Sequence, residues 1–525
     1  MLELFRAAVE AVGDRIACED LAERLTYAQV WAACRCLKSS IDEAVPTGQP
    51  VGILLPNDAT YPVAILACLA ANRPCVMIDR HHPEERVAAI VRDAGLGAII
   101  LRRSDIVGGL LLPAGIRTIV IDEALEGRSV PDRLSASSIP SGAGSFIVYT
   151  SGSTGQPKGI ALSQRAILHR VGHLINAVHL HPEDKLLSLA SPSTIAGLQH
   201  IFEAMLTGAA LVKLDLQRTG LGRVVQAIGE MGITMMFTTP AIWRSVARID
   251  NVAPALATLR CVHSSGDALL AIDLEQLRGV LPKDCHVLSS YGATEAPAML
   301  QWFVPPKLPN DGSRVPAGYP LPGFAVALLD DSGKAVKEGV PGEFVVKSPW
   351  MSLGLWRGGA VHPGLFQQDT RDLSAPVYRT GDIASRCPDG LIVMLGRKDR
   401  QIKILGNRVE LAEIETVLRQ ASDVADAAVV ARPVEGEPRL FAFVVPRGAR
   451  SSSFMVAVRQ HLKERLPAHM QPSHLHAIEE LPLLPGRKID EEALLAQTTQ
   501  HRPATPGASV PRPFARATAR WPDRF

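Results

Sequence analysis

The sequence predicts an α/β fold: a large N-terminal domain of layered, mostly parallel sheets with helices, followed by a small, mobile α+β domain. Three observations predict it: the length of 525 residues, an alternation of strand-like and helix-like runs, and a change of texture after about residue 395. A single hydrophobic core stops growing at about 250–300 residues, so more than one domain is expected. We expect a large domain over 1–398, a small one over 399–497, and a disordered tail over 498–525.

Apolar runs in the first part are short and alternate with segments of helical spacing, which is typical of crossover helices covering a parallel sheet. In the second part, strand-like and amphipathic runs make a compact unit of about 100 residues, the lower end of common domain sizes. Strands are expected at 50–57, 74–79, 97–101, 116–122, 145–150, 400–405, 426–433 and 439–446. Helices are expected at 61–73, 83–95, 163–178, 411–421 and 452–467.

Composition argues against several classes of function. The 55 lysines and arginines nearly cancel 53 acids, so no global field recruits nucleic acid or an anionic membrane. The eight cysteines are scattered and are interpreted as core thiols in a reducing compartment. The start lacks a basic segment followed by an apolar run, and no stretch approaches the roughly 18 apolar residues of a membrane helix. We therefore expect a cytoplasmic protein.

The stretch "YTSGSTGQPKGI" at 149–160 combines glycines, hydroxyls and a lysine between a strand and a helix that Ser163 could cap. Glycines let backbone N–H groups turn toward one point, and such a concavity suits phosphate oxygens. It is not a Walker loop, because Pro157 precedes the lysine. The alternative is an ordinary surface loop. The candidate phosphate-binding residues are Thr150, Ser151, Gly152, Ser153, Thr154, Gly155 and Lys158.

Four further motifs follow in order: "SSYGATEA" at 289–296, "YRTGD" at 378–382, "GRKDRQIKILGNRVELAEIE" at 396–415 and "LPLLPGRKID" at 481–490. With the glycine-rich loop they resemble the acyl-adenylate-forming enzymes, most closely the adenylation domains of nonribosomal peptide synthetases. The superfamily also includes acyl-CoA ligases and luciferases. The resemblance runs from about residue 10 to about 497.

This resemblance implies a ligase that activates a carboxylic acid with ATP and Mg²⁺ as an acyl-adenylate, releasing pyrophosphate. Two anions must meet, so positioning and charge stabilisation matter more than acid–base chemistry. It further implies that Tyr291 stacks on adenine, that Thr294 contacts the α-phosphate and that Glu295 binds Mg²⁺. Taken alone, each short motif is equally compatible with a turn. The remaining implied nucleotide contacts are Asp382 at the ribose, Arg397 beside it, and Gly266 with Asp267 near the adenine.

The same resemblance makes Lys488 the catalytic cation that offsets repulsion between the substrate carboxylate and the α-phosphate. The family pattern is Pro-Asn-Gly-Lys, whereas this chain has Arg487 before the lysine. Asp399 falls at the family's hinge, and Gly406 matches the glycine that lines a thiol tunnel after the small domain rotates. Alternatives are a surface Arg-Lys pair, a solvated linker and a glycine in a turn.

The acceptor is inferred from the small domain, where Glu410 and Leu411 favour a peptide-synthetase type over an acyl-CoA ligase. We expect transfer to the phosphopantetheine thiol of a carrier protein supplied in trans, because the last motif is followed by a short tail. Two enzymatic alternatives remain: an acyl-CoA ligase, and a ligase with a non-thiol acceptor such as a β-lactone synthetase. A non-catalytic binding module is disfavoured, since the motif residues Glu295, Asp382 and Lys488 are all present.

The substrate pocket departs from the peptide-synthetase pattern. Ile195 stands where an aspartate would bind an α-amino group, and no carboxylate occurs from Leu186 to Ile201. An unpaired ammonium in an apolar pocket is costly, so a hydroxy, keto, aryl or modified acid is expected. His263 could pair with a substrate group or be a core histidine. By the same alignment, the other lining residues are Ala196, Gln199, Phe237, Ser265, Ser290, Ala298 and Met299.

Overall fold

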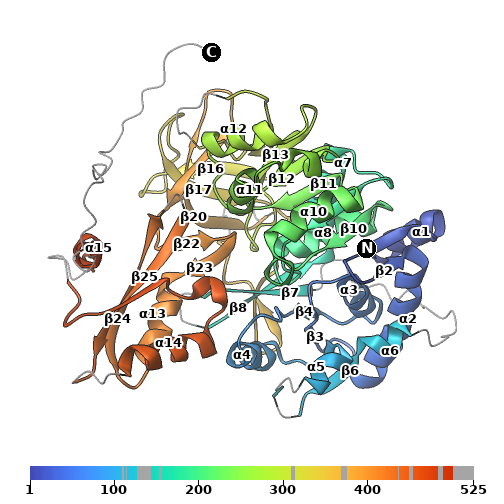
Figure 1. Cartoon of the computed structure of the whole chain (residues 1–525), viewed down its shortest axis with the longest axis horizontal. Coiled ribbons are helices and arrows are strands. Elements are labelled where there is room, and N and C mark those ends of the chain that lie inside the picture. The colour runs from blue at the N-terminus through green and yellow to red at the C-terminus, as the bar shows by residue number, and fades with distance from the viewer. Residues whose placement is uncertain are drawn as a thin grey trace.

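The structure is a computed structural model that describes residues 1–108, 112–113, 115–126, 144–152, 156–308, 314–367, 375–434, 437–448, 453–482 and 489–499 (Figure 1). Two layered sheets with helices form the larger part, so the predicted α/β class is confirmed. Of the expected tail, the segment from 500 onward lies outside the described residues.

The first sheet has the order β19-β18-β8-β7-β4-β3-β5-β6. The pairs from β7 to β6 are parallel, and the pairs from β19 to β7 are antiparallel. Every strand expected in the first 150 residues belongs to it. Its strands are β3 (Val51–Ile53), β4 (Cys75–Met77), β5 (Ala98–Leu101), β6 (Arg117–Val120), β7 (Gly144–Thr150), β8 (Lys158–Ser163), β18 (Gly354–Arg357) and β19 (Ala360–His362).

The second sheet has the order β15-β14-β13-β12-β11-β9-β10-β1-β2. From β13 to β1 all pairs are parallel, so the carboxyl ends of its central strands meet at one edge. Its strands are β1 (Ile16–Glu19), β2 (Arg24–Thr26), β9 (Lys185–Ser188), β10 (Ala210–Lys213), β11 (Met235–Thr238), β12 (Cys261–Ser264), β13 (His286–Tyr291), β14 (Leu300–Val304) and β15 (Tyr319–Pro320).

Two helices of this part begin or end at residues with a clear capping role. Ser163 Oγ accepts the Ala166 N–H at 3.2 Å and caps α7, as predicted, and Gly95 ends α4 with a φ of 66°. Among the described residues no helix has the length and apolar character to cross a membrane. The helices are α1 (Leu2–Val12), α2 (Tyr27–Ala44), α3 (Tyr61–Ala70), α4 (Glu84–Ala94), α5 (Arg103–Val107), α6 (Ile121–Leu125), α7 (Gln164–Val178), α8 (Ile195–Met205), α9 (Leu216–Thr219), α10 (Leu221–Met231), α11 (Pro240–Ala247), η1 (Ala253–Leu256) and α12 (Ala271–Val280).

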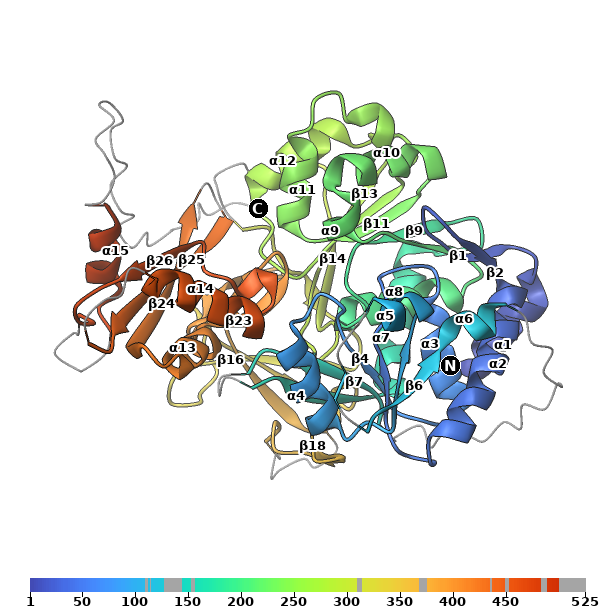
Figure 2. The ribbon, with the colours of Figure 1, turned by 60° about the horizontal axis from the view of Figure 1, so that its bottom comes forward.

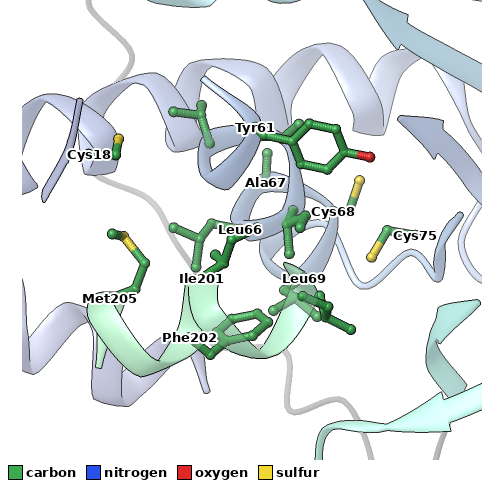
Figure 3. Packing of buried hydrophobic residues seen from close by; sticks show 14 of the residues in the cluster. Cys18, Tyr61, Leu66, Ala67, Cys68, Leu69, Cys75, Ile201, Phe202 and Met205 are labelled. Carbon is green, nitrogen blue, oxygen red and sulfur yellow. The ribbon is translucent and has the colours of Figure 1, made fainter. Parts of the chain in front are cut away.

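The main core lies between the sheets, where α3 is buried along its whole length (Figure 3). Ile201, Phe202 and Met205 of α8 pack into this cluster, and the Phe202 ring meets Phe146 of β7 edge-on at 5.6 Å. Seven of the eight cysteines are buried, which confirms them as core thiols. One face of α8 is fixed by the core, and residues of its first turns, Ile195, Ala196 and Gln199, line a cavity.

A third sheet is antiparallel and was not expected from the sequence. Its order is β16-β17-β20-β21, and its register places Asp382 opposite Arg397. Its strands are β16 (Ala325–Leu329), β17 (Gly342–Lys347), β20 (Val377–Arg386) and β21 (Ile392–Arg397).

The C-terminal part has its own hydrophobic core and the predicted α+β composition. A two-stranded hairpin precedes a three-stranded sheet with order β24-β25-β26. Its elements are β22 (Gln401–Ile404), β23 (Asn407–Glu410), α13 (Leu411–Gln420), β24 (Val424–Val434), β25 (Glu437–Pro446), α14 (Phe454–Arg465), η2 (Ala468–Met470), β26 (His474–Ala477) and α15 (Glu491–Thr499).

The small domain is closed onto the large one, with α14 beside α4 (Figure 2). Arg86 Nη1 on α4 lies 2.6 Å from Glu413 Oε1 on α13, and both side chains are buried. Arg465 Nη2 lies 3.0 Å from Glu85 Oε1 at the rim of this contact. The closure brings the β22–β23 hairpin to the carboxyl ends of the second sheet.

Candidate active site

A cavity of about 440 Å³ lies where the second sheet meets the small domain. Phe237, His263 and Ser290 line it from the adjacent strands β11, β12 and β13. Ligands of open α/β sheets bind outside the carboxyl ends of parallel strands, and these three residues lie at or near those ends. Sheet topology therefore gathers side chains that are distant in the sequence.

At one end of the cavity Tyr291, Asp382 and Arg397 converge. The Tyr291 hydroxyl donates to Asp382 Oδ2, and Arg397 Nη1 lies 2.9 Å from Asp382 Oδ1. Burial, and then the Asp382 carboxylate, raise the pKa of the Tyr291 phenol. An aromatic ring beside a carboxylate and a guanidinium fits a nucleoside with its hydroxyls.

The glycine-rich loop joins β7 to β8, a strand that intervenes before α7 and that the sequence analysis did not expect. A Cβ at Gly152 would lie 2.2 Å from Gln156 O, so this position requires glycine. Thr150 Oγ1 donates to Lys158 O at 3.4 Å, within the β7–β8 pair. Ser153, Thr154 and Gly155 lie outside the described residues.

Two donors of this loop are engaged by the small domain. Ser151 Oγ donates to Arg408 O at 2.8 Å, and the Gly152 N–H donates to Glu413 Oε2 at 3.0 Å. In this arrangement the loop binds the Glu413 carboxylate, and phosphate binding by the loop stays a prediction. A phosphate and Glu413 cannot occupy the Gly152 donor together.

Glu295 is fully buried beside this loop and is held by two cations. Its Oε1 lies 3.1 Å from Lys158 Nζ and 2.9 Å from Arg408 Nη1. Burial alone would raise the pKa of Glu295, but attraction by Arg408 and Lys158 lowers it to about 2. The neighbouring Thr294 also lines the cavity.

The Glu295 position fits Mg²⁺ because it already attracts positive charge. The described residues contain no cluster of three or more metal-binding side chains, so fewer than three of them would bind the ion beside Glu295. Mg²⁺ usually retains waters and takes substrate phosphates besides one or two carboxylates.

The other end of the cavity is the predicted acyl pocket. His263 Nε2 lies 2.6 Å from Ser290 Oγ, and its ring meets Phe237 edge-on at 5.3 Å. Met299, by contrast, is fully buried in a core cluster with Phe344 and is not brought to the wall. The predicted residues that do line the cavity are Ile195, Ala196, Gln199, Phe237, His263, Ser265, Ser290 and Ala298.

The hairpin turn places Gly406 against Gly266 of the large domain. A Cβ on Gly266 would lie 3.5 Å from Gly406 Cα, and the two residues have φ values of 88° and 80°. Asp267 next to Gly266 accepts the Ala268 N–H at 2.7 Å and is not among the cavity residues. Both glycines line the cavity, so the two domains meet at its wall through their backbones.

Asp399 lies between β21 and β22 and accepts from Arg397 Nε at 2.7 Å. Arg397 therefore bridges Asp399 and the Asp382 carboxylate. Lys488, together with Pro485, Gly486 and Arg487, lies outside the described residues.

The sequence analysis missed several residues of the site. Arg408 and Glu413 were read only as parts of a motif, although both contact the loop region of the large domain. Arg170 was overlooked on α7, where it shares the buried face with Ala166, Ile167 and Leu174. An arginine within an apolar helical stripe was the available signal, because charged side chains are almost never fully buried without a partner.

Fold and site together define an AMP-forming ligase. The chain matches the AMP-binding enzyme family over residues 5–356 and the AMP-binding enzyme C-terminal domain over 413–488. It belongs to the AMP-binding enzyme family.

Individual relatives agree with this assignment. One of the plipastatin synthase proteins of Bacillus subtilis (strain 168) is 30% identical over 502 residues, which are 94% of this chain and 19% of that protein. An artificially fused adenylation–PCP di-domain from Klebsiella oxytoca, NpsA-ThdA, has a TM-score of 0.77 at 23% identity, covering 90% of this chain and 93% of that one. A malonyl-CoA ligase complex with methylmalonyl-CoA and AMP has a TM-score of 0.75 at 25% identity, covering 89% and 97%. The chain thus spans about a fifth of the first relative.

Proposed function

We propose that the protein uses ATP to activate a carboxylic acid without a free α-amino group, and passes the acyl group to the phosphopantetheine thiol of a carrier protein. The observation that carries this proposal is one continuous cavity lined by Tyr291 and Asp382 at one end and by Gln199 and His263 at the other. A nucleotide and an acid bound at these ends would meet near Thr294.

In the first half-reaction the acid carboxylate attacks the α-phosphorus of ATP, forming a C–O–P bond while the bond to pyrophosphate breaks. Tyr291 stacks on the adenine, Asp382 accepts from the ribose hydroxyls with Arg397 and Gly266 beside it, and Thr294 contacts the α-phosphate. Mg²⁺ bound at Glu295 would neutralise phosphate charge. Lys158 and the 150–155 loop hold the β- and γ-phosphates, and Lys488 offsets repulsion between the reacting anions.

The second half-reaction requires the small domain to turn about Asp399. The closed arrangement suits this half-reaction, because Glu413 accepts the hydrogen bond of the Gly152 N–H and Arg408 pairs with the Glu295 carboxylate. These groups would otherwise serve pyrophosphate and Mg²⁺, so the arrangement fits a state after pyrophosphate has left. A thiol would then enter past Gly406 and attack the acyl carbon, expelling AMP.

The absence of an α-amino group in the acid is supported by the first turn of α8. Ile195 begins the helix, and Thr194 Oγ1 caps it by accepting the Gly197 N–H at 3.1 Å. This turn carries no carboxylate that could pair with an ammonium. An α-hydroxy, α-keto or unsubstituted acid avoids that unpaired charge.

Pyrophosphate exchange into ATP over a panel of acids, each with and without an α-amine, tests the activation step. Exchange that depends on the acid and prefers the members without an amine is the expected result. The acceptor is tested by product mass with holo-carrier protein, with coenzyme A, and without thiol. Acylation of coenzyme A alone would instead favour an acyl-CoA ligase, and a product formed without thiol would favour a non-thiol acceptor such as that of a β-lactone synthetase.

A further inference from the structure

Arg170 is a buried cation of the cavity wall. Its side chain is 2% exposed, and in the part of the chain that the structure describes neither Nε nor Nη1 has a hydrogen-bond partner. Within the same residues it forms no ion pair within 4.0 Å. A buried guanidinium without a hydrogen-bonded counter-charge is strongly destabilising, so an anion bound to Nε and Nη1 would stabilise the site.

Two further donors at the same wall are unpaired. Among the described residues, Gln199 Nε2 and His263 Nδ1 are buried without hydrogen-bond partners, and both residues line the cavity with Arg170. Ser290 Oγ can donate to His263 Nε2 at 2.6 Å, which leaves the ring proton of the neutral imidazole on Nδ1 as a donor. Buried polar groups are normally satisfied, so three unsatisfied residues at one wall indicate a ligand rich in acceptors.

The other buried bases near this wall carry little charge. Lys213 Nζ lies 3.4 Å from Ser188 Oγ, which in turn lies 2.9 Å from His200 Nδ1. Burial lowers the pKa of Lys213 to about 7 and holds the pKa of His200 well below 6.5, so His200 is neutral. The carboxyl group that attracts Arg170 electrostatically is that of Glu203, and burial raises the pKa of Glu203 to about 7. Glu203 is not among the cavity residues, and within the described chain neither of its buried oxygens accepts a hydrogen bond from the guanidinium.

The wall is distinct from the nucleotide end. Arg170 acts electrostatically on His200, Glu203 and His263, which belong to the acyl pocket or lie behind it. Glu295, in contrast, is held by Arg408 and Lys158. A group bound by Arg170 therefore belongs to the part of the acid away from the reacting carboxylate.

We infer that the acid activated by this enzyme is a dicarboxylic acid whose second carboxylate is bound by Arg170, with Gln199 and His263 as neutral donors. A planar guanidinium matches a carboxylate with two parallel hydrogen bonds. This inference rests on the proposed function, because it assumes that an acid occupies the pocket.

Pyrophosphate exchange with matched acids tests it: linear dicarboxylic acids of three to eight carbons and benzene dicarboxylic acids, each beside its monoamide and its monocarboxylic analogue. We expect the best dicarboxylic acid to exceed its monoamide at least tenfold in kcat/KM. Arg170→Met should lower kcat/KM for the dicarboxylic acid about 100-fold and leave the monocarboxylic analogue unchanged or improved. Gln199→Leu removes a neutral donor instead of a charge, so it should reduce the kcat/KM ratio of the dicarboxylic acid to its monocarboxylic analogue only severalfold.

Other outcomes separate the two proposals. If monocarboxylic acids are the best substrates and neither variant changes the ranking of the acids by kcat/KM, the inference of a dicarboxylic substrate is wrong. The proposal that the enzyme activates a carboxylic acid would still stand. Equal losses with diacid and monoacid in Arg170→Met would show a structural role for Arg170 as counter-ion to Glu203, and would also overturn the inference. Acid-independent exchange, or none with any acid, would contradict the proposed function itself.

Discussion

Among single residues, Lys488 has the most specific proposed role. Lys488→Ala should lower pyrophosphate exchange by about 100-fold or more, the usual effect of removing one group that stabilises transition-state charge. Thioester formation from supplied acyl-adenylate should largely survive, because the lysine would leave the site before transfer. Arg487→Ala is the matched control and should keep both half-reactions. Equal loss of both halves in Lys488→Ala would contradict the role.

Glu295 should make stability depend on pH. Its folded pKa of about 2 lies below the ordinary value of 4.5, so its stabilising contribution is complete above about pH 5 and is lost as pH falls toward 2. At about 1.4 kcal/mol per pKa unit the contribution is about 3 kcal/mol. The unfolding free energy of Glu295→Gln should fall below the wild-type value at pH 7 and approach it near pH 2. A gap independent of pH would contradict this account.

Among elements, the β22–β23 hairpin carries small-domain residues to the wall of the cavity. Gly406 has a φ of 80°, and a Cβ there would lie 2.4 Å from Thr239 Cγ2. Gly406→Ala should therefore impair thioester formation severalfold while pyrophosphate exchange continues. Adding Thr239→Ser removes the clashing methyl and should restore part of the rate, since the strain of positive φ remains. A double variant as slow as the single one would place the cause elsewhere.

Element prediction succeeded where periodicity was local. The runs at 61–73, 83–95 and 163–178 gave α3, α4 and α7 because apolar spacing, caps and glycine stops act within a few residues. The strand β8 was missed because "KGIALS" was read with the loop before it. The antiparallel sheet that presents Asp382 was also missed, since its central pair, β17 with β20, forms across β18 and β19, which belong to another sheet.

For the whole molecule, domain closure depends on the buried contact between Arg86 and Glu413. Glu413→Gln keeps an acceptor for the Gly152 N–H but leaves Arg86 without its counter-charge, so closure should weaken. We expect thioester formation to fall about tenfold or more while exchange persists, and small-angle scattering to report a more open shape. Arg465→Ala removes the rim pair with Glu85 and contacts within α14 but leaves the buried Arg86–Glu413 pair, so it should change little, about 0.5 kcal/mol or less. Unchanged scattering and thioester formation in Glu413→Gln would contradict this role.

By itself, the sequence determined the fold class, the helices and strands whose apolar period is clear, and the motifs that supply Tyr291, Thr294, Asp382 and Gly406 to the cavity. Those features depend on side-chain period, turn chemistry and short spacings, which act locally. Only the tertiary structure decided that Arg408 neutralises Glu295 across 113 residues and that Arg86 meets Glu413 across 327. It also decided that Met299 packs into the core and that Arg170 lines the acyl pocket with unsatisfied donors among the described residues. These contacts depend on how sheets and domains pack, and the energy of a buried charge is set by the partners that packing supplies.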